Sequence, residues 1–117
     1  LPVLSGPDGS AAQMLTLVQR VQPALTQLDM GIERVHLSGR GSWRVELDSG
    51  ATLELGRGSV AELQARTERF VRTVATVTAR WQAPLEYADL RHTDGYAVRL
   101  RGVSTQPPAA KPAAKTN

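Results

Sequence analysis

The chain has 117 residues, of which 41% are hydrophobic and 21% charged, a balance that predicts one folded domain. Its net charge of +3 comes without a Lys/Arg run or a basic stripe interleaved with aromatics, which argues against nucleic-acid binding. The lack of cysteine excludes disulfides, thiolate zinc sites and a cysteine nucleophile.

The first predicted element is a helix that follows a loop. Residues 1–9 are punctuated by prolines and glycines, which predicts the loop. Ser10 is placed to cap a helix whose apolar residues, spaced three and four apart, extend to Leu28. Pro23 falls inside this pattern. We expect it to kink or split the helix near residues 19–22, because proline removes a backbone hydrogen bond.

Strands and a second helix are predicted next. Polar and apolar side chains alternate in three segments and predict an antiparallel meander of half-buried strands, over residues 32–38, 42–48 and 51–55. Ser59 and Glu62 match a capping box, so we expect a helix to begin here and to run to about Arg80.

The segment YADLRHTDGYAVRL, residues 87–100, predicts two further strands joined by a tight turn. Asp94 and Gly95 are suited to the positive φ angles that such a turn needs. From Gly102 the chain is rich in Pro, Ala and Lys without periodicity. We therefore predict a folded domain over residues 1–101 and a disordered tail over residues 102–117.

The expected order of elements is α, βββ, α, ββ. The simplest closure is an α+β fold, in which two helices pack on one face of a mostly antiparallel or mixed sheet. No apolar run approaches the roughly 20 residues that are needed to span a bilayer.

No constellation of catalytic or metal-binding residues is found in the sequence. His36 falls in a predicted strand and His92 beside the predicted turn, far apart, and neither has a second His or Cys at ligand spacing, so we interpret them as surface or half-buried strand histidines. The turn at Gly56–Ser59 leads into a helix N-terminus, where anions can bind. However, GxGxxG is incomplete there, and a structural turn is favoured over phosphate binding. We expect no enzymatic activity and no cofactor.

The last predicted strand is the best remaining candidate for a function. Residues 96–100 have no later strand to cover them, so at a sheet edge their backbone groups are a template for another chain. The pattern leaves two interpretations open with equal weight. Either Arg99 and Arg101 blunt this edge, or a partner segment adds to it by β-augmentation.

Three segments in order, LPVLSGPDGS, GSWRVELDSGATLELGRG and YADLRHTDGYAVRL, resemble the C-terminal part of the FtsQ family of bacterial cell-division proteins. The resemblance covers about residues 1–101. It implies most of a periplasmic β domain without its first strands. A cytoplasmic tail, one inner-membrane helix and a POTRA domain would precede this domain. It also implies a non-enzymatic scaffold at the division septum, and we expect the domain alone to be monomeric.

The resemblance further implies a partner and a binding site. FtsQ-like β domains bind FtsB, which comes with FtsL, partly by adding an FtsB strand beside their last strand. By position, the family's contact arginines correspond to Arg40 and Arg91, and an aromatic contact corresponds to His92. The implied partner-binding residues are Arg40, Arg91, His92, Asp94, Gly95, Tyr96, Ala97, Val98, Arg99 and Leu100.

Two alternatives from other functional classes stay open at this point. One is a phosphate- or nucleotide-binding or enzymatic domain that uses the turn at Gly56–Ser59. The other is a peptidoglycan-binding module, suggested by the implied compartment.

Overall fold

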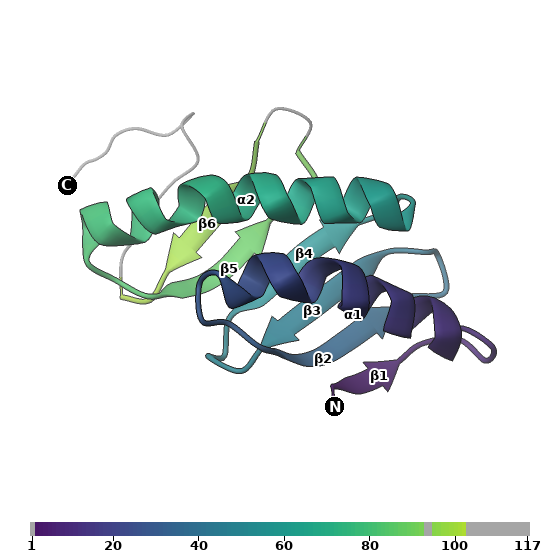
Figure 1. Ribbon diagram of the computed structural model, residues 1–117. Helices are drawn as coiled ribbons and strands as arrows, with labels where there is room; N and C mark the ends of the chain where they lie inside the picture. The colour runs from purple at the N-terminus through teal and green to yellow at the C-terminus, as the bar shows by residue number, and fades with distance from the viewer. Residues whose placement is uncertain (1, 93–94, 103–117) are drawn as a thin grey trace.

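The computed structural model describes residues 2–92 and 95–102, and over these residues a pair of helices covers one face of a six-stranded sheet (Figure 1). The elements in chain order are β1 (Val3–Ser5), α1 (Ala11–Thr26), β2 (Ile32–Leu37), β3 (Trp43–Leu47), β4 (Thr52–Gly56), α2 (Val60–Trp81), β5 (Leu85–Asp89) and β6 (Ala97–Leu100). The strands lie side by side in this same order, from β1 at one edge to β6 at the other. The predicted α+β class is confirmed.

The sheet is mixed because each helix connects two parallel strands. β1 and β2 are parallel and joined by α1, and β4 and β5 are parallel and joined by α2. The remaining neighbours are antiparallel, which confirms the predicted meander of β2, β3 and β4. The topology therefore consists of two successive β-α-β-β units that meet at the central pair of β3 and β4.

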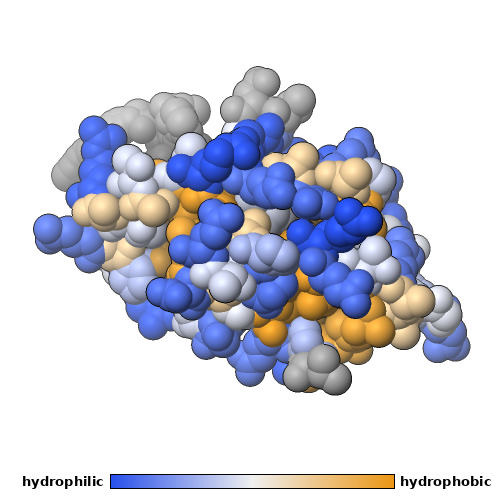
Figure 2. Space-filling model, in the orientation of Figure 1, coloured by the Kyte–Doolittle hydropathy of each residue, from blue (hydrophilic) through white to orange (hydrophobic). Residues whose placement is uncertain are grey.

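The core lies between the sheet and the helices and is mostly aliphatic. One row of the sheet is fully buried and joins neighbouring strands by register, through Val35, Val45, Leu53 and Ala88. Trp43 and Phe70 are the largest fully buried side chains. The outside of the helix-covered face is largely hydrophilic (Figure 2). Burial of each Val or Leu side chain contributes roughly 1.5–3 kcal/mol to the free energy of folding. This core therefore stabilises the sheet, including its opposite face and its edges.

In the N-terminal region, the predicted loop over residues 1–9 and the predicted split of the first helix are wrong. A short strand, β1, lies inside the segment predicted as a loop. Its parallel pairing places Leu4 opposite Val35, where Leu4 packs against the core, and a local pattern cannot reveal such a partner. α1 continues through Pro23 without a break. Pro23 is exposed, so its ring lies on the solvent side while the buried face of the helix stays in contact with the core.

The two helix starts differ from each other. At α2 the predicted capping box is confirmed: the Ser59 hydroxyl accepts a bond from the Glu62 N–H at 3.1 Å, and the Glu62 carboxylate accepts one from the Ser59 N–H at 2.7 Å. Ser10 is the N-cap residue of α1, but its side chain does not cap the helix. Its hydroxyl instead donates to the Pro7 carbonyl at 2.5 Å.

The predicted two-residue turn before β6 has the wrong register. A turn at residues 94 and 95 would place Ala97 opposite His92, whereas Ala97 lies opposite Asp89. Asp94 lies outside the described residues. The cause is Leu90, which is buried and whose N–H donates to the Glu54 carbonyl at 2.8 Å, so the chain follows β4 past Asp89. The tail from residue 103 onward also lies outside the described residues.

Candidate functional site

β6 forms one edge of the sheet. It pairs with β5 on one side, and no strand within residues 2–92 and 95–102 lies along its other side. Leu100 is 1% exposed, and Tyr96 and Val98 are partly buried against the same core, whereas Arg99 is exposed. The edge strand is therefore anchored by one row of side chains. Because Leu100 is buried, it could meet a partner only through its backbone.

Asp89 connects this edge to Arg91. The Arg91 side chain donates through Nε and Nη2 to the two oxygens of Asp89, at 2.8 and 2.7 Å, and the Arg91 N–H donates to Oδ1 at 3.0 Å. These bonds lower the pKa of the Asp89 carboxyl and raise the pKa of Arg91. His92 Nε2 lies 3.9 Å from the same carboxylate. Since the Arg91 side chain is 55% exposed, its guanidinium is fixed in direction yet open to a further anion.

A glycine allows Arg91 to lie across the end of β4. Gly56 has a φ of +81°, and a Cβ at this position would lie 2.7 Å from Cγ of Arg91. The glycine thus serves two needs, since it supplies the left-handed backbone and leaves space for the stem of Arg91. The predicted structural role of this turn agrees with that arrangement.

Arg40 and Arg91 are distant in sequence but line one hollow of about 440 Å³. Its lining consists of Ser38, Arg40, Ser42, Gly56, Arg57, Arg66 and Arg91. Nη1 of Arg66 donates to the carbonyls of Leu55 and Arg57, at 2.8 and 2.6 Å, and so ties α2 to the end of β4. Four guanidinium groups around one hollow make it strongly cationic, which suits a carboxylate.

Sequence reasoning missed two of these four arginines. Arg57 was included in a structural turn, and Arg66 was not singled out, although it is partly buried. The only local signal was an arginine between two glycines at the junction of a strand and a helix. Their convergence with Arg40 depends on tertiary structure.

The N-terminus of α2 offers no open anion site, contrary to the phosphate-binding alternative. The Glu62 carboxylate occupies this end of the helix, and its bonds to Ser59 lower the pKa of Glu62. A phosphate would therefore meet a negative charge. The described residues contain no group of three His, Cys, Asp or Glu that could hold a metal ion. Likewise, neither helix within residues 2–92 is long and apolar enough to cross a membrane.

The sheet face opposite the helices is charged and internally paired. Arg44 donates to Oε2 of Glu54 through Nε and Nη2, at 3.1 and 2.7 Å, and Nε of Arg34 lies 3.4 Å from Glu46. Near the β6 edge, the Arg99 guanidinium lies 5.3 Å from the centre of the Tyr87 ring, a cation–π contact. His36 also lies near Glu46, at 3.6 Å, consistent with its interpretation as a strand histidine.

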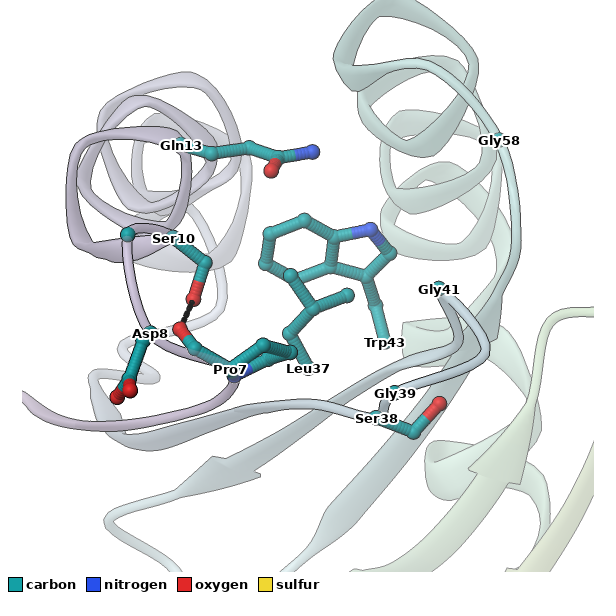
Figure 3. A pocket seen from close by; sticks show the side chains of 11 residues that line it. Pro7, Asp8, Ser10, Gln13, Leu37, Ser38, Gly39, Gly41, Trp43 and Gly58 are labelled. Carbon is teal, nitrogen blue, oxygen red and sulfur yellow. Dashed lines mark hydrogen bonds between the residues drawn. The ribbon is translucent and has the colours of Figure 1, made fainter.

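A second hollow of about 440 Å³ lies beside the start of α1. Figure 3 shows the indole of Trp43 within it, with the Gln13 amide on one side and the bond between Ser10 and Pro7 at its rim. Asp8 is the one charged side chain among its lining residues. No nucleophile and base come together there, so this hollow provides no catalytic arrangement.

Comparisons with known proteins agree with the resemblance. Residues 1–91 match the family model described as "Cell division protein FtsQ/DivIB, C-terminal". The chain is 34% identical over 104 residues to cell division protein FtsQ of Thiomonas arsenitoxydans, covering 88% of this chain and 38% of the relative. The identity to FtsQ of Burkholderia pseudomallei is 36% over 104 residues, covering 88% and 42%. For FtsQ of Nitrosospira multiformis it is 39% over 99 residues, covering 85% and 41%. The chain thus spans about two fifths of the length of these relatives.

Proposed function

The chain belongs to the C-terminal family of the cell-division proteins FtsQ and DivIB, and from this premise we propose that it is a non-enzymatic scaffold domain that binds a division partner along β6. The proposed partner is an FtsB-like protein accompanied by an FtsL-like one. The proposed location is the periplasmic side of the inner membrane at the septum, with the membrane anchor in another region of the longer protein. The observation that carries this proposal is the position of β6 at the sheet edge, where no strand from residues 2–92 and 95–102 lies along its outer side.

Strand addition is supported by how β6 is held. Its apolar side chains are fixed against the core, so the edge is a stable template for main-chain hydrogen bonds with an extended segment. Arg99 lies over Tyr87 and does not extend across the edge as a free charge. This contact favours the open-edge interpretation over the blunted one.

The cationic hollow suggests the chemistry of the partner. Arg91 carries more N–H donors than the two that bond to the Asp89 oxygens, so it can also bind a partner carboxylate. Arg40, Arg57 and Arg66 lie around the same hollow. We therefore propose that the partner segment places acidic side chains here while its backbone extends along β6.

Disulfide cross-linking tests strand addition directly, because the natural chain contains no cysteine. Residues opposite each other on neighbouring antiparallel strands have Cα atoms about 4.5–5.5 Å apart, within the range that a disulfide can bridge. We expect Arg99→Cys to cross-link with cysteines placed in the FtsB-like periplasmic segment. The yield should peak at the partner position directly opposite residue 99 and be low at the two positions beside it, because their side chains point to the other face of the strand.

Arg44→Cys is the matched control, since Arg44 is an exposed arginine on the same sheet face but on the central strand β3. It should give little cross-linking. Equal yields from Arg44→Cys and Arg99→Cys would contradict the proposal, and so would high yields at consecutive partner positions.

A further inference from the structure

The residue that precedes β6 is fastened to helix α2. The hydroxyl groups of Tyr96 and Thr73 are hydrogen-bonded to each other. The Tyr96 ring also meets the buried Phe70 ring edge-on, with 5.1 Å between the ring centres and 78° between the ring planes. We name Phe70, Thr73 and Tyr96 the α2 latch. It connects the start of the edge strand to the helix layer.

The α2 latch lies where the pairing of β6 with β5 ends. The ladder between β5 and β6 ends at the pair of Asp89 and Ala97, and Tyr96 is the next residue beyond it. Gly95 supplies no packing on the preceding side, since a Cβ there would meet nothing within 4 Å. A four-residue strand that pairs with one neighbour among the described strands is prone to fray at such an end. The latch restrains the strand where its own ladder stops.

The hydroxyl pair can be separated from core packing. Phe70 is fully buried, and the Tyr96 ring is held against it whether or not the hydroxyl is present. Thr73 is exposed, so its bond to Tyr96 lies at the surface. The bond therefore fixes the orientation of the chain at Tyr96 and buries little apolar area.

We infer that Tyr96 and Thr73 are positioning residues for partner binding, which hold β6 in its strand conformation before the partner arrives. This inference rests on the proposed function, because it concerns the same edge. A site that is already ordered avoids some of the ordering entropy on binding, and apparent affinity falls with the fraction of molecules in the competent conformation.

The test compares Tyr96→Phe, Thr73→Val and the double variant with the natural sequence, all in the full chain. The probe is a synthetic peptide of the FtsB-like periplasmic segment. Each single variant is expected to bind up to about fivefold more weakly, because fivefold is the limit set by the loss of one surface hydrogen bond. Thr73→Val also removes the bonds from this hydroxyl to the Arg69 and Phe70 carbonyls, at 3.3 and 3.4 Å, whereas the bond between the two hydroxyls is lost in both variants. The double variant should therefore be no weaker than Thr73→Val alone. In the free protein, amide hydrogen exchange should accelerate in β6 and stay unchanged in β3.

Thr78→Val is the matched control. Thr78 lies on the same helix, and its hydroxyl bonds to the Val74 and Ala75 carbonyls of that helix, at 3.2 Å each. Its removal should leave peptide affinity unchanged.

The possible outcomes separate the two proposals. If the natural protein binds the peptide and both latch variants bind equally well, the latch is refuted while the proposed function stands. Additive losses in the double variant, or a lower melting temperature with unchanged affinity, also refute it. If the natural protein does not bind the peptide, the proposed function fails, and the inference fails with it.

Discussion

Asp89 connects the two parts of the candidate site. Its backbone faces Ala97 of the edge strand, and its carboxylate holds Arg91, which lines the cationic hollow. A single side chain thus sets the distance between the backbone template and the positive charge. Asp89 was not among the predicted contact residues, and its carboxylate accepts bonds from Arg91.

The pairing with Arg91 makes the contribution of Asp89 to stability depend on pH. The pKa of Asp89 is lowered in the folded protein, chiefly by the Arg91 side chain. A lowered pKa means that the stabilisation is present above the unfolded value, about pH 4, and is lost as pH falls through the folded pKa. We predict that the natural protein is more stable than Asp89→Asn at neutral pH, and that this difference shrinks steadily below about pH 4. Urea unfolding at a series of pH values measures it.

Arg91→Gln is the companion variant for this prediction. It removes the cation and keeps the carboxylate, so its stability relative to the natural protein should change over the same acidic range. A difference between the natural protein and Asp89→Asn that is constant from neutral to acidic pH would contradict the assigned cause.

At the scale of elements, α2 serves both the core and the site. It buries Leu63, Phe70 and Val74 on one side, and it carries Arg66 of the cationic hollow and Thr73 of the latch. Its capping box fixes where the helix starts and therefore which turn presents each of these residues. Correct placement of the helix start is thus needed for both sites.

Ser59→Ala is expected to lower the free energy of unfolding by about 1 kcal/mol, because the Glu62 N–H loses its cap. Urea unfolding followed by circular dichroism measures the change. Ser59→Asp, which supplies another capping oxygen, should restore most of the loss. Ser5→Ala, in the exposed edge strand β1, is the control and should have a smaller effect. Equal losses for Ser5→Ala and Ser59→Ala would contradict the role of the cap.

The same elements show what local sequence patterns can and cannot predict. Alternation in residues 42–48 and the capping box at Ser59 depend on near neighbours, and both were predicted correctly. β1 was missed because its strand character comes from pairing with β2, across the whole of α1. The turn before β6 was misplaced because the Leu90 N–H bonds to Glu54, on a strand more than thirty residues earlier.

The candidate site was only partly predictable for a related reason. The family resemblance supplied Arg40 and Arg91, whereas periodicity alone gave only an uncovered last strand. Arg57 and Arg66 join them through the packing of α2 on the end of β4, which no spacing in the sequence encodes.

At the scale of the whole molecule, the two β-α-β-β units share one core. β3 and β4 pair across the boundary between the units, and the buried residues of both units form one cluster. Each unit alone would leave one face of its helix and the edge of a central strand exposed to water. We therefore expect the repeated topology to fold as one cooperative unit.

Leu53→Ala tests this cooperativity, because Leu53 is fully buried on β4 opposite Val45 of the first unit. The variant should be destabilised by about 2–5 kcal/mol, the usual loss for a buried leucine. In a Trp81→Phe background, fluorescence reports the buried Trp43 of the first unit, while far-ultraviolet circular dichroism reports both helices. The two urea midpoints should coincide and shift together. Leu15→Ala removes the same atoms from a side chain that is 43% exposed, and should change stability by about 0.5 kcal/mol or less. Two separate transitions would show that the units unfold independently.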